Sequence, residues 1–165
     1  MRTILLLIAF AATTAQATPL SLAEKARLFQ HDMERRFLLD GQALCKLKPP
    51  TGSRDFGIYV GTLSMKYAVT QAEDDRKAAL ESLDALHLLC NVSGKPGLLA
   101  RAAWPKDRPM EDDGIWRDSP DGKHKWRGDV STDQMDGVLY GFSVAYALLA
   151  NEAQKQRIAK DVAAL

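Results

Sequence analysis

The 165-residue chain is poor in the residues that most often build metal and redox sites. It contains two cysteines and three histidines, and His31, His87 and His124 are scattered outside any recognised ligand spacing. The sequence also lacks a nucleophile elbow, a phosphate-binding loop and a dinucleotide fingerprint. We therefore expect neither a metal nor a cofactor.

An excess of either charge is lacking as well. The chain has 22 basic and 21 acidic residues, a formal net charge of +1, and the two signs are interleaved along the sequence. Nucleic acids and anionic membranes select clustered cations, so this balance argues against both as partners. A glycan or another small polar ligand suits the charge better.

The N-terminal segment has the pattern of an export signal. A positive end at Arg2 precedes an apolar run over residues 4–12, and Ala15-Gln16-Ala17 has the form of a cleavage site. The sequence thus predicts a signal peptide over 1–17, a domain over 18–165, and a periplasmic or secreted protein. The apolar run is too short for a membrane span, so we expect no stable membrane anchor.

Export affects the interpretation of the two cysteines, Cys45 and Cys90. An oxidising compartment permits a disulfide that the cytosol would not, and we predict that these residues form one. The alternative is two buried thiols, each at the end of a helical segment.

Helix signals dominate the rest of the chain. Capping boxes begin at Ser21, Thr70 and Ser131, and each is followed by apolar residues at helical spacing. The expected helices run from 21 to near Gly41 or the Pro49-Pro50 pair, and over about 50–70, 70–94, 131–149 and 151–165. A strand is the alternative for the first half of the 50–70 segment. The predicted fold class is all-α.

Two of these regions resemble each other. Gly57-Ile58-Tyr59-Val60-Gly61 precedes the cap at Thr70, and Gly137-Val138-Leu139-Tyr140-Gly141 precedes a cap at Asn151. Each region is interpreted as an antiparallel helical hairpin with a Gly-bearing inner helix; chance similarity of two apolar helices is the alternative. A long Trp-, Pro- and Asp-rich loop, roughly 94–130, joins the hairpins.

The end of this loop and the following helix entry, residues 116–137, contain the candidate site. Asp129 and Asp133 are the candidate catalytic carboxylates, because they lie four residues apart across a helix start. A helix N-terminus keeps carboxylates ionised, which favours a base, nucleophile or sugar-binding role. Alternatively, Asp133 only complements the helix dipole.

Four further residues are candidate substrate contacts. Trp126 and Trp116 could stack on pyranose faces, and Arg101 and Arg127 could bind a carboxylate, as on a uronic acid. Alternatively, each tryptophan packs in the core, and each arginine pairs with a neighbouring Asp that holds the loop in place.

The segment from Trp126 to Gln134, together with Gly137, is similar to a W-x-G-D-x-S-x-D-Q pattern of uncharacterised exported bacterial members of the α/α-toroid, six-hairpin glycosidase-like superfamily. The resemblance covers mainly residues 56–165. It implies part of an α/α toroid whose inner-helix entry loops bind glycans. In that superfamily, the catalytic residues of the hydrolases are carboxylates, and those of the related lyases are Tyr, His or Arg.

A closed toroid needs more hairpins than the two counted here. We therefore expect an N-terminal part of a longer protein, an oligomer, or a smaller helical bundle of another kind. The leading hypothesis is an exported protein that binds or processes carbohydrate, as a glycoside hydrolase, a polysaccharide lyase or a binding protein. The alternative is a non-enzymatic helical module that mediates a protein interaction.

Overall fold

The computed structural model describes residues 19–43, 57–110 and 114–165. Its elements are α1 (Leu22–Arg36), β1 (Leu38–Leu39), β2 (Gln42–Ala43), α2 (Ile58–Thr70), α3 (Glu73–Asn91), β3 (Ala102–Pro105), β4 (Trp116–Asp118), β5 (His124–Arg127), α4 (Thr132–Leu148) and α5 (Glu152–Ala164). The described part of the chain is therefore mixed α/β, and the prediction of an all-α toroid is wrong. The predicted signal peptide, 1–17, lies outside the described residues.

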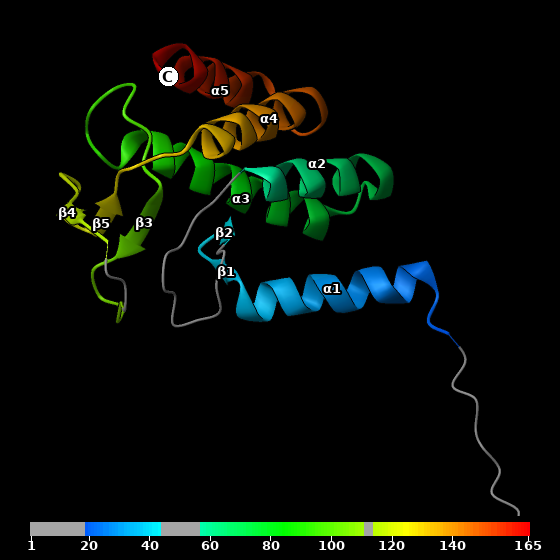
Figure 1. Cartoon of the computed structure of the whole chain (residues 1–165). Coiled ribbons are helices and arrows are strands. Elements are labelled where there is room, and N and C mark those ends of the chain that lie inside the picture. Colours follow the sequence, from blue (N-terminus) through cyan, green and yellow to red (C-terminus); the bar gives the residue numbers. More distant parts are fainter. Residues whose placement is uncertain (1–18, 44–56, 111–113) are drawn as a thin grey trace, which may run out of the picture.

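Four helices form two hairpins, α2–α3 and α4–α5, that lie side by side (Figure 1). Their inner helices, α2 and α4, approach closely where the repeated glycines lie. A Cβ atom on Gly57 would lie 2.4 Å from the carbonyl oxygen of Gly137, and one on Gly141 would lie 2.4 Å from that of Gly57. The glycines of the internal repeat thus bring two helix backbones into contact.

The long connection between the hairpins contains the strands that the sequence did not predict. β3, β5 and β4 form an antiparallel sheet in that order, and Ala103 pairs with Trp126. Trp126 is buried in the main core, whereas Trp104 packs with Leu39 in a second cluster. Strand pairing satisfies the backbone of a segment whose large aromatic side chains must be buried.

The first helix ends earlier than expected. α1 begins with the predicted capping box, in which Ser21 and Glu24 bond reciprocally, but it ends at Arg36, and β1 and β2 follow as a short hairpin. The turn between them uses Asp40 and Gly41, both with positive φ. Gln42 then bonds through its side-chain amide to both the N–H and the C=O of Ala103, which joins this hairpin to β3.

The main core lies between the two helical hairpins and the sheet. Among its most buried members are Leu86, Leu89, Val138 and Phe142, and burying side chains of this size contributes about 1.5–3 kcal/mol each. No helix in the described ranges is long and apolar enough to cross a membrane.

Cys90 belongs to this core and is a free thiol. The predicted disulfide between Cys45 and Cys90 is therefore wrong, and Cys45 itself lies outside the described residues. The apolar face of α3 takes Cys90 into the interior, where it packs as a small hydrophobic side chain.

Candidate functional site

The candidate site lies where β5 leads into α4. Asp129 has a left-handed backbone with φ of +59°, which costs an L-residue about 1–2 kcal/mol. Its carbonyl oxygen accepts a hydrogen bond from the Arg101 guanidinium. Gln134, which is fully buried, donates to the carbonyl oxygen of Arg101 over 2.9 Å. This pair of bonds holds the strained turn in place.

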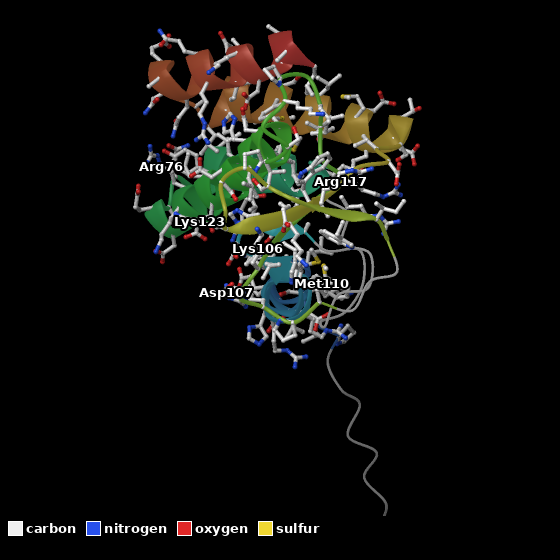
Figure 2. All side chains as sticks on the ribbon, turned by 90° about the vertical axis from the view of Figure 1, so that its left-hand side faces the viewer. Arg76, Lys106, Asp107, Met110, Arg117 and Lys123 are labelled. Carbon is white, nitrogen blue, oxygen red and sulfur yellow. The ribbon has the colours of Figure 1, made fainter. Side chains whose placement is uncertain are left out.

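A pocket of about 300 Å³ lies beside this turn. It is lined by Lys95, Leu98, Arg117, Trp126, Gly128 and Asp129, and we call it the Asp129 pocket. Arg117 lies on β4, at one edge of the three-stranded sheet (Figure 2), and its guanidinium carbon is 5.3 Å from the centre of a Trp126 ring. The pocket therefore combines two cations and one carboxylate with apolar surface.

Trp126 contributes little of its surface to this pocket, because it is only 6% exposed. Its ring packs in the main core and is approached by Arg117. The two interpretations of this residue, core packing and ligand contact, thus both have a structural basis.

The other predicted site residues do not line the Asp129 pocket. Asp133 is exposed in the first turn of α4, where an acidic residue stabilises the helix dipole. Trp116 pairs with Arg127 across β4 and β5, and Trp116 packs against the second hydrophobic cluster. Arg127 lies against Gly114, where a Cβ atom would be 2.5 Å from the guanidinium carbon.

Four pocket residues were not among the site residues predicted from the sequence, and two of them, Lys95 and Arg117, are charged. Lys95 lies in the turn after α3 and Arg117 lies on β4, so the fold alone brings them to Asp129. Arg117 follows the half-buried Trp116 and is exposed on β4. Its neighbours in the sequence therefore give little indication that it lines a pocket.

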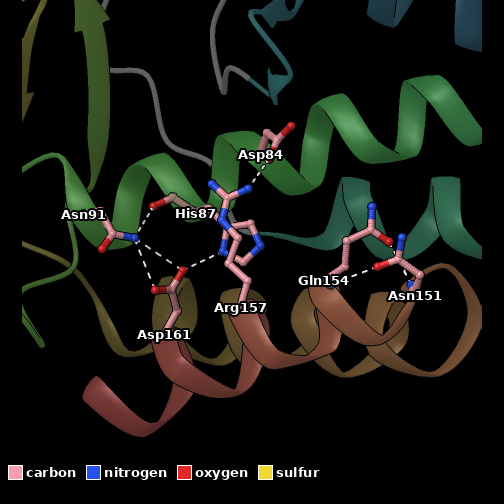
Figure 3. A network of polar contacts seen from close by, with 7 residues as sticks. All are labelled: Asp84, His87, Asn91, Asn151, Gln154, Arg157 and Asp161. Atoms are coloured by element: carbon pink, nitrogen blue, oxygen red, sulfur yellow. Dashed lines mark hydrogen bonds and ion pairs between the residues drawn. The ribbon is translucent and has the colours of Figure 1, made fainter.

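A second polar cluster joins the outer helices α3 and α5 (Figure 3). Nδ1 of His87 lies 2.5 Å from Oδ2 of Asp161, and Asn91 donates to both carboxylate oxygens of Asp161. Burial alone would raise the pKa of Asp161, but the hydrogen bonds from His87 and Asn91 outweigh it, so this pKa is lowered. At the surface nearby, Arg157 pairs with Asp84 over 2.5 Å.

This second cluster lacks a nucleophile, although Cys90 lies nearby. Burial, assisted by the negative charge of Asp161, raises the pKa of the Cys90 thiol to about 12. A thiol with such a pKa stays protonated at neutral pH and is unreactive. Within the described ranges no three His, Cys, Asp or Glu residues come together to hold a metal ion.

A third ionic contact stabilises the turn between β4 and β5. Asp121 is partly desolvated, which opposes ionisation, but bonds from His124 and from the backbone N–H groups of Lys123 and His124 lower its pKa strongly. The distance from Nδ1 of His124 to Oδ2 of Asp121 is 2.6 Å. This contact orders a turn and lies outside the Asp129 pocket.

No family model matches the chain, and searches of curated proteins and of solved structures found no similar protein. Inferences about its function therefore depend on the geometry of the Asp129 pocket.

Proposed function

We propose that the protein binds a saccharide in the Asp129 pocket. The observation that supports this most directly is the left-handed Asp129, whose backbone is fixed by Arg101 and whose carboxylate borders a pocket. Backbone strain of this kind concentrates at functional sites. The backbone of Asp129 is then held in position before a ligand arrives, which lowers the entropic cost of binding.

The pocket offers groups that match a sugar ring. The Asp129 carboxylate accepts hydrogen bonds from hydroxyl groups, and Lys95 and Arg117 donate to ring or hydroxyl oxygens. Leu98 and the accessible part of Trp126 contact the apolar C–H face of the ring. With two cations against one carboxylate, the pocket is expected to bind an acidic saccharide more tightly than a neutral one.

The proposed chemistry beyond binding is cleavage of a glycosidic bond, for which Asp129 and Asp133 are the candidate carboxylates. Hydrolysis commonly requires one carboxyl group as acid and another as base or nucleophile. In this proposal Asp129, which borders the pocket, acts as the base or nucleophile. Because Asp133 lies outside the pocket lining, a cleaved ligand would have to extend from the pocket onto α4.

The test compares cellotetraose, which is neutral, with tetragalacturonate, using intrinsic tryptophan fluorescence and calorimetry. The unmodified protein should bind both, and tetragalacturonate more tightly. Asp129→Asn should weaken cellotetraose binding about tenfold, the loss expected for a hydrogen bond to a charged group. Asp136→Asn is the matched control, because Asp136 is an exposed carboxylate of α4 outside the pocket.

Equal affinities in the two variants, or no binding of either saccharide, would overturn the proposal. Product analysis after long incubation tests cleavage separately. Asp133→Asn should then abolish turnover but leave the affinity for cellotetraose unchanged, and unaltered turnover would exclude Asp133 from catalysis.

A further inference from the structure

α1 exposes an apolar stripe. Leu22, Ala26, Phe29 and Met33 recur at helical spacing, and none of the residues of α1 is buried. Leu22 is 84% exposed and Phe29 is 73% exposed. Isolated helices of this length are marginal in water, so the stripe is suited to packing against another surface. We call it the α1 stripe.

A second uncovered apolar surface lies between α4 and α5. It is a groove lined by Leu139, Phe142, Ser143, Tyr146, Ile158, Ala159 and Val162, and we call it the α4/α5 groove. Leu139, Tyr146 and Val162 are 36%, 45% and 39% exposed. Side chains of this kind gathered in one concave surface are typical of a docking site.

The internal repeat indicates what kind of segment fits this groove. The glycines at 57 and 61 correspond to those at 137 and 141, a shift of 80 residues. With the same shift, two residues of α2 correspond to two that line the α4/α5 groove: Tyr59 to Leu139 and Leu63 to Ser143. The outer helices α3 and α5 begin 79 residues apart, at Glu73 and Glu152, so the correspondence of side chains is drawn for the inner helices alone.

In the first hairpin this surface borders the segment that ends α1. Tyr59, Leu63, Ala78 and Ser82 line a pocket together with Glu34 and Leu38. Gly41 approaches α3 so closely that a Cβ atom would lie 2.3 Å from the carbonyl oxygen of Glu81. The equivalent groove of the second hairpin is lined by α4 and α5 alone.

The charges of α4 and of the N-terminal part of α1 are complementary, whereas α5 places the Lys155 ammonium over the ring of Tyr146. α4 carries two carboxylates, Asp133 and Asp136, and no cation. The N-terminal part of α1 carries Lys25 and Arg27, while its one carboxylate, Glu24, is bonded to Ser21. A helix with this charge is attracted to the side of the groove formed by α4.

We propose that the α1 stripe of one copy docks into the α4/α5 groove of a second copy of this chain. α1 and α5 lie on opposite sides of the molecule, with the inner helices between them (Figure 1), so α1 does not reach the groove of its own chain. This contact is heterologous, because it joins two different surfaces. If each of two copies docks its α1 stripe into the other's groove, a closed dimer forms. If not, successive copies add to one another in an open chain.

The experiment measures the mass of the purified protein by sedimentation equilibrium over a wide range of concentrations. The unmodified protein should associate as its concentration rises. Phe29→Asp, in the stripe, and Val162→Asp, in the groove, should each remain monomeric at every concentration tested. Leu28→Asp is the matched control: Leu28 is 57% exposed on α1 but lies off the stripe, so this variant should associate like the unmodified protein.

Mixing the two monomeric variants gives a sharper test. Phe29→Asp retains an intact groove and Val162→Asp retains an intact stripe, so an equimolar mixture should form a one-to-one complex. Tyr146→Asp, also in the groove, replaces Val162→Asp if that variant loses helix content by circular dichroism. An unmodified protein that stays monomeric, equal association of Phe29→Asp and Leu28→Asp, or a mixture without complex would each overturn the proposal.

Discussion

Nδ1 of His87 lies 2.5 Å from Oδ2 of Asp161, and this contact connects the outer helices of the two hairpins inside the protein. Asp161 accepts further bonds from Asn91. Because an ionised carboxylate can only accept, Nδ1 carries the proton in this bond. The hairpins are thus joined by a glycine contact between α2 and α4 and by a polar contact between α3 and α5.

Removing Asp161 should destabilise the fold substantially. In Asp161→Ala, the buried His87 loses its acceptor, and leaving a buried donor unpaired costs about 1–3 kcal/mol. Asp84→Asn breaks an exposed ion pair with Arg157 and should cost less than about 1 kcal/mol. Urea denaturation of both variants measures these values, and similar small losses would show that the buried contact contributes little.

The contribution of Asp161 should depend on pH in a defined direction. Its folded pKa is lowered from an ordinary value of 3.8, so its stabilisation is fully present above that value and is lost as the pH falls through the folded pKa. The difference in unfolding free energy between the unmodified protein and Asp161→Ala should be constant from neutral pH down to about 5, and should shrink below about 4. A difference that shrinks already between pH 7 and 5 would contradict this assignment.

The glycine contact between α2 and α4 should not tolerate a side chain. In Gly141→Ala the Cβ atom would lie 2.4 Å from the carbonyl oxygen of Gly57, and overpacking of this kind costs about 1–3 kcal/mol. The control is Gly122→Ala, which has no atom within 4 Å of its Cβ and only a positive φ of +73° to accommodate. The melting temperature of Gly141→Ala should be lower than that of Gly122→Ala. The reverse order would mean that α2 and α4 can move apart at little cost in stability.

Cys90 should resist alkylation in the folded protein. The thiol is buried, and its pKa of about 12 leaves almost no thiolate at pH 8. Iodoacetamide should therefore label the peptide that carries Cys90 only after denaturation, without any reductant, as mass spectrometry can show. A requirement for reductant in the denatured state would reveal a disulfide and contradict the free thiol of the structure.

Arg117 should determine the preference of the Asp129 pocket for an acidic saccharide. Arg117→Gln removes one of the two cations that line the pocket, so affinity for tetragalacturonate should fall about tenfold, as for loss of a charge-assisted bond. Affinity for cellotetraose should fall less. Lys106→Gln is the control, because Lys106 pairs with Asp118 outside the pocket. Equal losses for both saccharides would show that charge does not contribute to selectivity.

The helices could be predicted because their signals are local. The capping box at Ser21 and the cap at Asn151 occur as the sequence indicates, and the repeated glycines indicate close helix packing. The predicted boxes at Thr70 and Ser131 are wrong, because α3 has Ala72 as its N-cap residue and Ser131 makes no side-chain cap bond. The strands could not be predicted, because each described strand spans four residues or fewer, and β3 pairs with a strand that is distant in sequence, as for Ala102 and Arg127. The disulfide prediction failed because the spacing of the cysteines in the sequence does not show that Cys90 lies on the side of α3 that faces the core.

For the candidate site, local sequence identified Asp129 and Trp126 because both lie in one short segment. The residues that complete the pocket come from the turn after α3 and from β4, so only tertiary structure assembles them. Asp133, Trp116 and Arg127 lie outside this pocket. Their positions depend on how α4, β4 and β5 are oriented around the turn at Asp129, which the sequence does not show.

The most direct test of saccharide binding at Asp129 is a nuclear magnetic resonance titration of the isotope-labelled protein with cellotetraose and tetragalacturonate. The backbone amide signals of Lys95, Gly128 and Asp129 should shift progressively with both ligands. The amides around His87 and Asp161 should remain unchanged. Shifts confined to that second cluster, or the absence of any shift at saturating saccharide, would contradict saccharide binding at Asp129.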